Sequence, residues 1–487
     1  MAYNKSHSLN WNKILLIKPN FHSIGWDFYN MNFPPISLTY IASYLEDLPV
    51  EIKILDSKLK NLSHNQIKKR IREYNPDIVG VSVFVSAAIN ECFRIGQSVK
   101  EIDHKIPVVF GGRHPTFEVS ETLKNEYVDI IVRGEGELTF REMISKGSCE
   151  GIKGVSYKKN GRIIHNPDRE LMSKQEYSNI RLPARHLTNG NKYKMLTVRL
   201  ETVETSRGCP YSCKFCTTWK INNRTWRSRP IRKIIEELML ISQNKRITDI
   251  FLVDDELSAN TKRVERLCEQ IIYFKDKGLI NDFKFFAQIR VDDIVRSPSM
   301  VEKMAEAGFW AVFIGIESID EESLKEMRKQ ITFEKVLKAL KILDKNSILS
   351  IGNLIIGVNL HDTREDIIRQ IEVMKDTDVD IISFVILTPF PGSDTLEEMD
   401  EKSLLISKNW SRYTVMEPVI KTYELSPGDL YELLYLSFRE LKYINNARKI
   451  VRKARRKRGL RFLLNPFRLI SVIKSYMEMR ALFQDVS

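Results

Sequence analysis

The sequence predicts an α/β protein in which a doubly wound, Rossmann-like domain comes first, a partial (β/α)6 barrel follows, and the C-terminal region is helical. Short apolar runs alternate with amphipathic stretches over residues 10–145, and a second series of the same kind fills residues 197–395. Glycines or polar side chains end most of these runs, which is where parallel sheets bind ligands. A chain of 487 residues also needs more than one hydrophobic core, because a single core seldom serves more than about 300 residues.

The N-terminal series starts with the apolar run of residues 13–19, which Pro19 closes as in a buried strand. Residues 34–47 follow, with apolar side chains at helical spacing behind a proline start signal. The alternation continues to residue 137. It predicts strands over residues 50–56, 77–84, 106–112 and 128–137, a helix over residues 63–76 and another through Phe93. We therefore expect a parallel, doubly wound sheet within a first domain of residues 1–145.

Residues 146–196 are less regular, and we interpret them as a linker. Within this stretch, residues 154–167 alternate like two short strands around Asn160-Gly161. This dipeptide is a strong signal for a two-residue hairpin turn. We expect a small hairpin in the linker.

The second series contains six apolar runs, most of them followed by a helical pattern, which suits a full or partial β/α barrel over residues 197–395. The runs are LETVETSRG, DIFLVDDE, FKFFAQIR, WAVFIGIES, SIGNLIIGV and IISFVILTPF. In such barrels the carboxyl ends of all strands share one mouth. The polar residues expected at that mouth are Cys209, Asp254, Asp255, Glu256, Arg290, Glu317 and Thr388.

Half of the six cysteines lie in one short segment, RGCPYSCKFCTTW. Their spacing, C-x3-C-x2-C, brings three thiols together, and no other Cys or His lies within about twenty residues. A structural zinc site would need four protein ligands. An iron–sulfur cubane held by three thiolates instead leaves one iron without a protein ligand, which a small molecule can occupy. The segment therefore predicts a cluster with an open coordination site.

This motif, with Phe215 before its last cysteine and at the head of a β/α barrel, resembles that of radical S-adenosylmethionine (SAM) enzymes. The resemblance implies that Cys209, Cys213 and Cys216 hold a [4Fe-4S] cluster whose open iron binds the amino and carboxylate groups of SAM. One electron, from a donor such as flavodoxin or ferredoxin, then releases a 5′-deoxyadenosyl radical. GNLIIGV and TPFPGSD also resemble strand motifs of this family. The SAM contacts implied by the resemblance are Phe215, Asp254, Asp255, Glu256, Arg290 and Glu317.

Some of these residues have structural alternatives. Asp255 and Glu256 could cap the helix that follows them. Arg290 could form an ion pair with Asp292 or Asp293, and Glu317 could begin the helix of IDEESLKEM. The position of Glu317 at the end of an apolar strand favours a role in the site.

The first domain resembles the cobalamin-binding domain that precedes the radical domain in one branch of this family. That branch includes enzymes such as the anaerobic Mg-protoporphyrin ester cyclase and hopanoid-type methylases. The matching segments are PPISLTYIASYLED, PDIVGVSVFVSA, VVFGGRHPT and VDIIVRGEGE. The alternative is a Rossmann-like domain that binds nothing. The cobalamin contacts implied by the resemblance are Ser82, Gly111, Gly112, His114, Thr116, Gly134 and Glu135.

The segment NFHSIG, after the first strand, resembles the D-x-H-x-x-G motif whose histidine ligates cobalt in other cobalamin proteins. Asn20 stands where that motif has Asp. A metal-ligating histidine usually has a carboxylate partner, so we interpret His22 as a polar loop residue.

The net charge of +13 is concentrated in the last 46 residues, which carry thirteen Lys or Arg against two acids. Basic and apolar residues interleave there, at the end of an accessory region of residues 396–487, so the tail could lie on an anionic membrane surface. A solvated tail is the alternative, and nucleic acid is disfavoured because no recognition fold accompanies the charge. The N-terminus lacks the apolar core of a signal peptide, and no run of about 18 apolar residues occurs. We expect a cytoplasmic protein, with peripheral attachment to the inner membrane face left open.

These observations predict a cobalamin-dependent radical SAM enzyme that modifies an unactivated carbon of a small-molecule or lipid-like substrate. C-methylation is the first expectation, and a cobalamin-assisted oxidative cyclisation is the alternative. A tRNA methylthiotransferase would need three cysteines in the first domain, whereas residues 1–145 contain only Cys92, with Cys149 just beyond. A non-catalytic cobalamin-binding module remains a second alternative, although it would not need the cluster motif.

Overall fold

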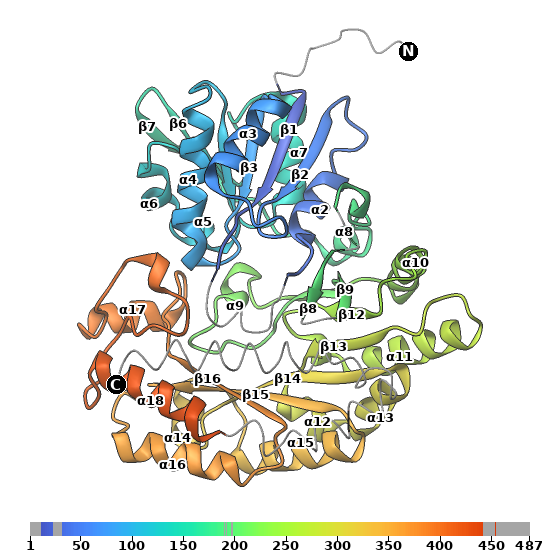
Figure 1. Ribbon diagram of the computed structural model, residues 1–487, viewed down its shortest axis with the longest axis vertical. Coiled ribbons are helices and arrows are strands. Elements are labelled where there is room, and N and C mark those ends of the chain that lie inside the picture. Colours follow the sequence, from blue (N-terminus) through green and yellow to red (C-terminus); the bar gives the residue numbers. More distant parts are fainter. Residues whose placement is uncertain are drawn as a thin grey trace. The chain divides into compact units, whose positions relative to one another are not determined.

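The computed structural model describes residues 11–22, 32–188, 190, 192–195, 198–441 and 453 (Figure 1). The chain divides into two compact units. Unit 1 contains Met1–His22 and Pro34–Gly190, and unit 2 contains Ser23–Phe33 and Asn191–Ser487. Each unit is built around a seven-stranded sheet of its own.

The sheet of unit 1 has the strand order β2-β1-β3-β4-β5-β6-β7. Strands β1 to β5 are parallel, and β6 and β7 extend the sheet in antiparallel fashion. The strand order reverses at β1, where doubly wound folds open a ligand crevice at the carboxyl ends of the strands. The strands are β1 (Lys13–Lys18), β2 (Glu51–Asp56), β3 (Ile78–Ser82), β4 (Val108–Gly111), β5 (Ile130–Val132), β6 (Val155–Lys159) and β7 (Arg162–His165).

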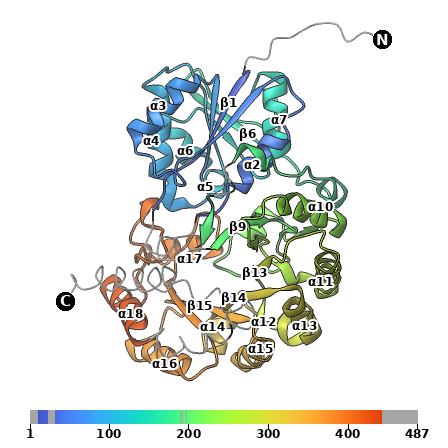
Figure 2. The same cartoon turned by 45° about the vertical axis from the view of Figure 1, so that its right-hand side comes forward.

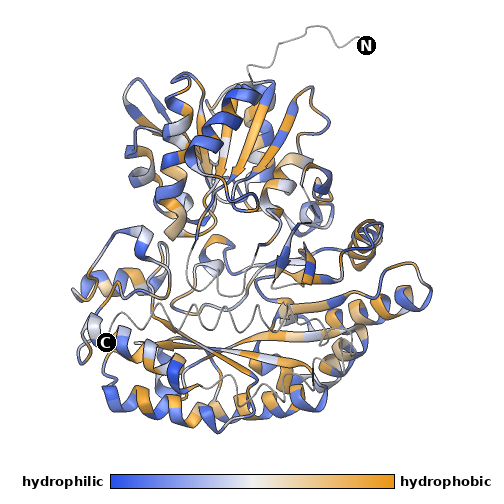
Figure 3. Ribbon diagram, in the orientation of Figure 1, coloured by the Kyte–Doolittle hydropathy of each residue, from blue (hydrophilic) through white to orange (hydrophobic). Residues whose placement is uncertain are grey.

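Helices cover both faces of this sheet (Figure 2): α2 packs against α7, and α3 packs against α4. Helix α3 starts with a capping box. In it, the Ser63 side chain accepts from the Gln66 backbone N–H, and the Gln66 side chain accepts from the Ser63 backbone N–H. The strands are the most apolar segments of the unit, as Figure 3 shows. The helices are α2 (Ile36–Ser43), α3 (His64–Tyr74), α4 (Ile89–Lys100), α5 (Arg113–Phe117), α6 (Val119–Lys124), α7 (Gly136–Lys146) and α8 (Lys174–Ser178), with 3₁₀ turns η1 (Ser86–Ala88) and η2 (Arg185–Leu187).

The hairpin expected in residues 154–167 is formed by β6 and β7. Asn160 and Gly161 both have positive φ, 51° and 73°, as a two-residue turn of this kind requires. Because β6 pairs with β5, the hairpin is part of the unit 1 sheet. The stretch that we interpreted as a linker is thus packed into unit 1 as far as Gly190. The domain boundaries at 145, 196 and 395 stay predictions.

The sheet of unit 2 has the order β16-β15-β14-β13-β12-β9-β8. Its six strands from β9 to β16 are parallel, and each lies beside its neighbours in the chain, so the sheet is an open half-barrel of the expected (β/α)6 kind. The strands are β8 (Lys194–Met195), β9 (Val198–Val203), β12 (Asp249–Leu252), β13 (Lys284–Gln288), β14 (Phe309–Glu317), β15 (Leu349–Ile356) and β16 (Ile381–Ile386).

One expected strand is two strands. LETVETSRG contains the end of β9 and then β10 (Ser206–Gly208), which pairs with β11 (Trp226–Ser228) in a separate two-stranded sheet. The break occurs at Thr205, whose backbone N–H donates to the Asp254 carboxylate at 2.7 Å instead of to a neighbouring strand. This turn directs the chain out of the barrel sheet immediately before the three cysteines.

Helices α11 to α16 connect strands of unit 2 and lie along one side of its sheet (Figure 1). Several begin with a side-chain cap, such as Thr363 before α16, which supplies an acceptor for an unpaired first-turn amide. The helices are α9 (Thr218–Ile221), α10 (Ile231–Ser242), α11 (Thr261–Asp276), α12 (Val291–Arg296), α13 (Pro298–Ala307), α14 (Glu321–Glu326), α15 (Phe333–Lys345), α16 (Arg364–Lys375), α17 (Asp394–Glu401) and α18 (Pro427–Glu440), with 3₁₀ turns η3 (Leu257–Ala259) and η4 (Trp410–Arg412).

The basic tail, residues 442–487, lies outside the described residues except for Lys453. The buried ammonium of Lys453 pairs with Asp380 at 2.7 Å and with Asp344 at 2.9 Å. Asp380 directly precedes β16, so Lys453 contacts the amino end of the barrel strands. Within the described part of the chain, no helix is both long enough and apolar enough to span a bilayer.

Candidate active site

The three cysteines lie on the loop between β10 and α9, beyond the carboxyl end of the first barrel strand. All three thiols are free; Cys213 is buried, and Cys209 and Cys216 are partly exposed. The pKa of the Cys209 thiol is raised to about 12, chiefly by burial and in smaller part by the nearby charges of Glu256, Cys216 and Cys213. The backbone N–H of Tyr211 donates to Cys209 and opposes this shift.

This loop fits an iron–sulfur cluster. A buried thiol loses its proton when a metal ion binds to the sulfur. The resulting thiolates are the ligands of iron–sulfur clusters. Cations compensate the resulting negative charge: although burial raises the pKa of Cys213, Lys329 and Arg290 act to lower it. Among the described residues, no three His, Cys, Asp or Glu side chains converge on a point that could hold a single metal ion. The three thiols of this short loop suit a cubane, in which each thiolate ligates a separate iron.

The Asp254 carboxylate is fully buried and holds the start of the cysteine loop, and its expected contact with SAM stays a prediction. It accepts hydrogen bonds from the Thr205 backbone at 2.7 Å, from the Thr205 hydroxyl at 2.6 Å and from the Ser206 hydroxyl. Burial raises its pKa, and these three donors lower it. Asp254 therefore positions the chain that leads to Cys209.

Asp255 lies closer to the loop and is only partly buried. Its carboxylate accepts from the Gly208 N–H at 3.2 Å and from the Thr218 hydroxyl at 3.3 Å. These residues flank the three cysteines on either side. Asp255 thus joins the two ends of the loop, and the helix-capping alternative does not describe it.

Glu256 does act as a cap. Its carboxylate accepts from the Ser258 N–H at 2.9 Å at the start of η3, which confirms the capping alternative for this residue. Burial raises the pKa of Glu256 to about 7, so at neutral pH it is close to its titration midpoint. The nearby charge of Arg290 lowers this pKa. A carboxyl group in this state responds strongly to an additional cation.

Arg290 follows β13 and makes three interactions. Its Nε donates to Asp292 at 2.8 Å, so the expected ion-pair alternative is present. Its guanidinium also donates to the Lys329 carbonyl at 2.9 Å and lies 3.6 Å from the centre of the Tyr211 ring. Because Tyr211 lies between Cys209 and Cys213, Arg290 connects the third barrel strand to the cysteine loop.

Glu317 ends β14 with a positive φ of 64°, an uncommon conformation for a residue other than glycine. Its carboxylate pairs with Lys329 at 2.7 Å, and both residues are nearly inaccessible, at 6% and 7% exposure. Gly315 leaves room for this pair, since a Cβ there would overlap both charged groups. The helix-start alternative for Glu317 is wrong, because α14 begins at Glu321 and is capped by Asp320.

Lys329 was not among the sequence-predicted site residues. It lies in a polar stretch after α14, and no periodicity or motif of its own distinguished it from surface lysines. Only the fold pairs it with Glu317 and brings its charge close enough to lower the pKa of Cys213.

Two other predicted residues make fewer contacts in the site. Phe215 is partly exposed on the cysteine loop. The buried Thr388 hydroxyl donates to the Ile386 carbonyl at 3.0 Å.

In unit 1, Ser82, Gly111 and Gly112 lie at the carboxyl ends of β3 and β4. Gly112 has a φ of 120°, and a Cβ at this position would overlap the Val83 carbonyl oxygen. Only glycine allows this close approach of two backbones. Gly134, after β5, has a φ of 68°, and a Cβ there would point into open space. The edge thus offers the kind of backbone surface that a large cofactor can approach.

Hydrogen bonds of side chains hold the loops after β4 and β5 together. The Thr116 hydroxyl donates to the Gly112 carbonyl at 2.7 Å and accepts from the Gly134 N–H at 3.0 Å, so it links the loops after β4 and β5. His114 is buried, and burial lowers its pKa to about 4, which keeps the imidazole neutral. Glu135 accepts from the Met172 N–H at 2.8 Å.

His22 is exposed after β1. The Asn20 amide, which replaces the motif carboxylate, donates to the Asn61 side chain at 3.2 Å and to the Leu62 carbonyl at 3.1 Å. Asn20 therefore secures the loop after β2. The interpretation of His22 as a polar loop residue stays a prediction.

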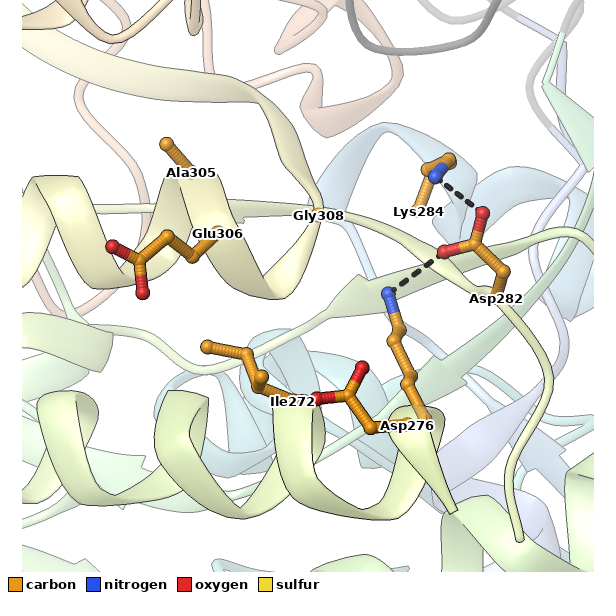
Figure 4. A pocket seen from close by; sticks show the side chains of 8 residues that line it. Ile272, Asp276, Asp282, Lys284, Ala305, Glu306 and Gly308 are labelled. Atoms are coloured by element: carbon orange, nitrogen blue, oxygen red, sulfur yellow. Dashed lines mark hydrogen bonds and ion pairs between the residues drawn. The ribbon is translucent and has the colours of Figure 1, made fainter. Parts of the chain in front are cut away.

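A pocket of about 500 Å³ lies at the opposite end of unit 2 from the cysteines, near the amino ends of β13 and β14 (Figure 4). Three of its charged groups pair with one another: Asp282 accepts from Lys275 at 3.2 Å and from Lys284 at 2.7 Å. Lys275 also donates to the Ala307 carbonyl at the end of α13 and to the Phe283 carbonyl just before β13. These bonds hold the two segments together. The pocket is lined by Ile272, Lys275, Asp276, Asp282, Lys284, Ala305, Glu306 and Gly308.

Comparison with known families matches both units. Residues 29–144 match the B12 binding domain, and residues 203–369 match the radical SAM superfamily. A Pyrococcus horikoshii protein named as an uncharacterized methyltransferase is 34% identical over 88% of this chain and 92% of that protein. The anaerobic magnesium-protoporphyrin IX monomethyl ester cyclase of Rubrivivax gelatinosus is 26% identical over 89% of this chain and 78% of that enzyme.

A solved structure shares the fold. The radical SAM methyltransferase TsrM of Kitasatospora setae, with cobalamin and a [4Fe-4S] cluster bound, superposes with a TM-score of 0.68. The match covers 88% of both chains at 17% identity, a level that shows a shared fold. The Pyrococcus horikoshii relative is 34% identical over nearly the whole of both chains, which establishes the family. The chain belongs to the cobalamin-binding radical SAM enzymes, whose cofactors are cobalamin, a [4Fe-4S] cluster and S-adenosylmethionine.

Proposed function

We propose that this enzyme transfers a methyl group to an unactivated carbon of a small molecule, with its catalytic centre at the carboxyl ends of the unit 2 strands. The observation that carries the proposal is the three-thiol loop, which is surrounded by paired charges at the mouth of a half-barrel. The 34% identical relative named as a methyltransferase favours methyl transfer. Radical SAM enzymes also need a reductant, for which flavodoxin or ferredoxin are the donors we propose.

Cys209, Cys213 and Cys216 would each ligate one iron of the cluster. Lys329 and Arg290 lower the pKa of Cys213 and so favour the thiolate that iron requires. When bound, the cluster and SAM supply an organic radical and cobalamin supplies the methyl group. The residues of this chain would bind and orient these groups.

SAM carries an ammonium and a carboxylate, and the site holds partners for both. Glu256 has a pKa of about 7, so an adjacent ammonium would favour its charged form and gain a charge-assisted hydrogen bond. Arg290 would offer its guanidinium to the carboxylate, and the Glu317 carboxylate would accept hydrogen bonds from hydroxyl groups of the ribose. Phe215 would lie beside the adenine. We assign Asp254 and Asp255 to the positioning of the cysteine loop, because both carboxylates already accept its hydrogen bonds.

Cobalamin would lie over the carboxyl edge of the unit 1 sheet. Gly111, Gly112 and Gly134 let the backbone approach the cofactor, and Ser82 offers a hydroxyl at the end of β3. Neutral His114 could contact an uncharged amide of the cofactor without an additional ion. Thr116 and Glu135 hold the loops in place through their hydrogen bonds to Gly112, Gly134 and Met172.

Oxidative cyclisation is the second candidate, since a relative of 26% identity is named as a cyclase. A lipid-like substrate would suit a tail that binds membranes, although that tail lies outside the described residues. The test is to incubate anaerobically reconstituted enzyme with reductant, cobalamin, methyl-deuterated SAM and a lipid or metabolite extract. A product that gains one deuterated methyl group supports methylation. A product that loses hydrogen without gaining the label supports cyclisation, and failure to form 5′-deoxyadenosine rejects both.

A further inference from the structure

Lys214 lies inside the cysteine motif, directly after Cys213, and all of its polar groups are engaged. Its backbone N–H donates to the Met327 carbonyl at 3.1 Å, and its carbonyl accepts from the Thr395 N–H at 3.3 Å. Its ammonium lies 2.6 Å from Glu398 and 3.5 Å from Glu326. One residue of the loop is therefore attached both to the segment after α14 and to α17.

The segment that receives the Lys214 N–H, residues 327–329, also contacts the charged groups near the cluster loop. Lys329 pairs with Glu317 at 2.7 Å, and its carbonyl accepts from Arg290. Arg328 pairs with Asp394 on α17 at 2.6 Å. The cysteine loop, the Glu317–Lys329 pair and α17 thus share one short piece of chain.

The ion pair of Lys214 differs from an ordinary surface pair. Its side chain and that of Glu398 are 14% and 16% exposed, so water screens their attraction only in part. Glu398 is also paired with Lys402 at 2.7 Å, one turn further along α17. Removal of Lys214 would therefore leave Glu398 with a partner, and the main loss would be the attachment of the loop.

We propose that Lys214 is a positioning residue that holds the three-cysteine loop between residues 327–329 and α17. Its hydrogen bonds and ion pairs are with neighbours of the loop, so we assign its effect to the cysteines that flank it. The consequence for catalysis rests on the proposed function, in which these cysteines ligate the cluster. The attachment of the loop by Lys214 does not depend on the proposed function.

The first test uses the apoprotein. Lys214→Met is compared with Lys402→Met, a matched control that removes a cation from the same Glu398 carboxylate at the far end of α17. The rate of iodoacetamide alkylation is measured at Cys213 by peptide mass spectrometry, with the fully buried Cys268 on α11 as an internal reference for global opening. We expect Lys214→Met to react about fivefold faster at Cys213, equivalent to about 1 kcal/mol of local opening. Cys268 should be unchanged, and Lys402→Met should match wild type.

The second test uses the reconstituted enzyme. Lys214→Met should shift the midpoint potential and the electron paramagnetic resonance signal of the reduced cluster, and Lys214→Arg should restore both. The proposal is overturned if Cys213 reacts at the wild-type rate in Lys214→Met, if Lys402→Met reacts equally fast, or if Cys268 accelerates in parallel. If wild-type protein assembles no cluster at all, the proposed function fails while the alkylation result still decides the role of Lys214.

Discussion

The carboxyl edges of the two sheets are built from different chemistry. In unit 1, the loop after β4 is held by the Thr116 hydroxyl, by backbone groups and by a glycine that tolerates no side chain. In unit 2, the corresponding edge is held by buried or half-buried ion pairs such as Glu317–Lys329 and Arg290–Asp292. After β4 and β5 the edge of unit 1 presents mainly backbone, with one ion pair, Lys18–Asp56 at 3.2 Å, at the ends of β1 and β2. The edge of unit 2 presents several charged groups.

This difference matches the ligands that the family binds. Cobalamin is large and its periphery consists mainly of neutral amides, so shape and close backbone approach determine how well it fits. SAM is charged, and a cluster held by three thiolates is anionic, so their site needs compensating charges in a water-poor environment. The comparison predicts that unit 1 is sensitive to small changes in volume and unit 2 to changes in charge.

The largest effect is expected at the cysteine loop. Cys213→Ala removes one thiolate, and a cubane held by two protein ligands should not persist. We expect loss of the [4Fe-4S] absorbance and loss of reductive SAM cleavage after anaerobic reconstitution, while cobalamin binding to unit 1 is retained. Cys268→Ala is the control, since that buried thiol lies on α11. SAM cleavage at the wild-type rate in Cys213→Ala would remove the basis of the assignment.

The next largest effect tests charge in unit 2. Lys329→Met leaves the Glu317 carboxylate buried without its cation, which should lower the free energy of unfolding by about 3 kcal/mol. The double variant Lys329→Met/Glu317→Gln should recover much of this loss, because no buried charge is then left unpaired. Thermal unfolding of the apoproteins measures both. Equal stability of the single and double variants would contradict the coupling.

A volume change tests unit 1. Gly112→Ala forces a Cβ against the Val83 carbonyl at a φ of 120° and should cost about 2 kcal/mol of stability. Gly134→Ala, at a φ of 68° with open space around it, should cost about 1 kcal/mol. If cobalamin approaches Gly134 as proposed, Gly134→Ala nevertheless weakens cobalamin binding, measured by the absorbance of the bound cofactor. Unchanged cobalamin affinity in that variant would place the cofactor away from β5.

The smallest effect concerns the pH dependence contributed by Glu256. Its pKa of about 7 in the folded chain exceeds the ordinary value of 4.5, so between these pH values the folded state binds more protons than the unfolded state. The free energy of unfolding should therefore fall as pH rises through this window, by less than about 1.4 kcal/mol per pH unit. Glu256→Gln should remove this slope in a thermal-unfolding series.

Proton release on SAM binding is a more specific test of Glu256. If the SAM ammonium lies beside Glu256, SAM binding lowers the Glu256 pKa and releases a fraction of a proton near pH 6.5. Calorimetry in two buffers with different ionisation enthalpies detects that release in the wild type, and Glu256→Gln should lack it. Absence of proton release in both proteins would assign Glu256 to the capping of η3 alone.

Elements with strong local signals could be predicted from the sequence. Periodicity located every strand of the two sheets from β1 to β5 and from β12 to β16, because side-chain alternation and flanking turns are short-range properties. The Asn160-Gly161 hairpin also followed from turn chemistry. The break between β9 and β10 did not, because it depends on a hydrogen bond from Thr205 to Asp254, 49 residues away.

The candidate site divides in the same way. The cysteine spacing was enough to indicate a cluster, since three thiols within eight residues must lie close together in any fold. The roles of the carboxylates were not accessible in this way. Asp254, Asp255 and Glu256 are adjacent in the sequence, yet one holds the start of the loop, one joins its ends and one caps a 3₁₀ turn.

By itself, the sequence determined the two α/β units, the three-thiol loop and the glycine-rich strand ends, all of which depend on residues near one another along the chain. Only the tertiary structure decided which charges meet: that Lys329 lies under Glu317, that Arg290 stacks on Tyr211, and that Lys214 joins the loop to α17. The physical reason is that ion pairs act over a few ångströms in space and leave no periodic mark in the chain, so their partners become visible only once distant strands end at the same edge.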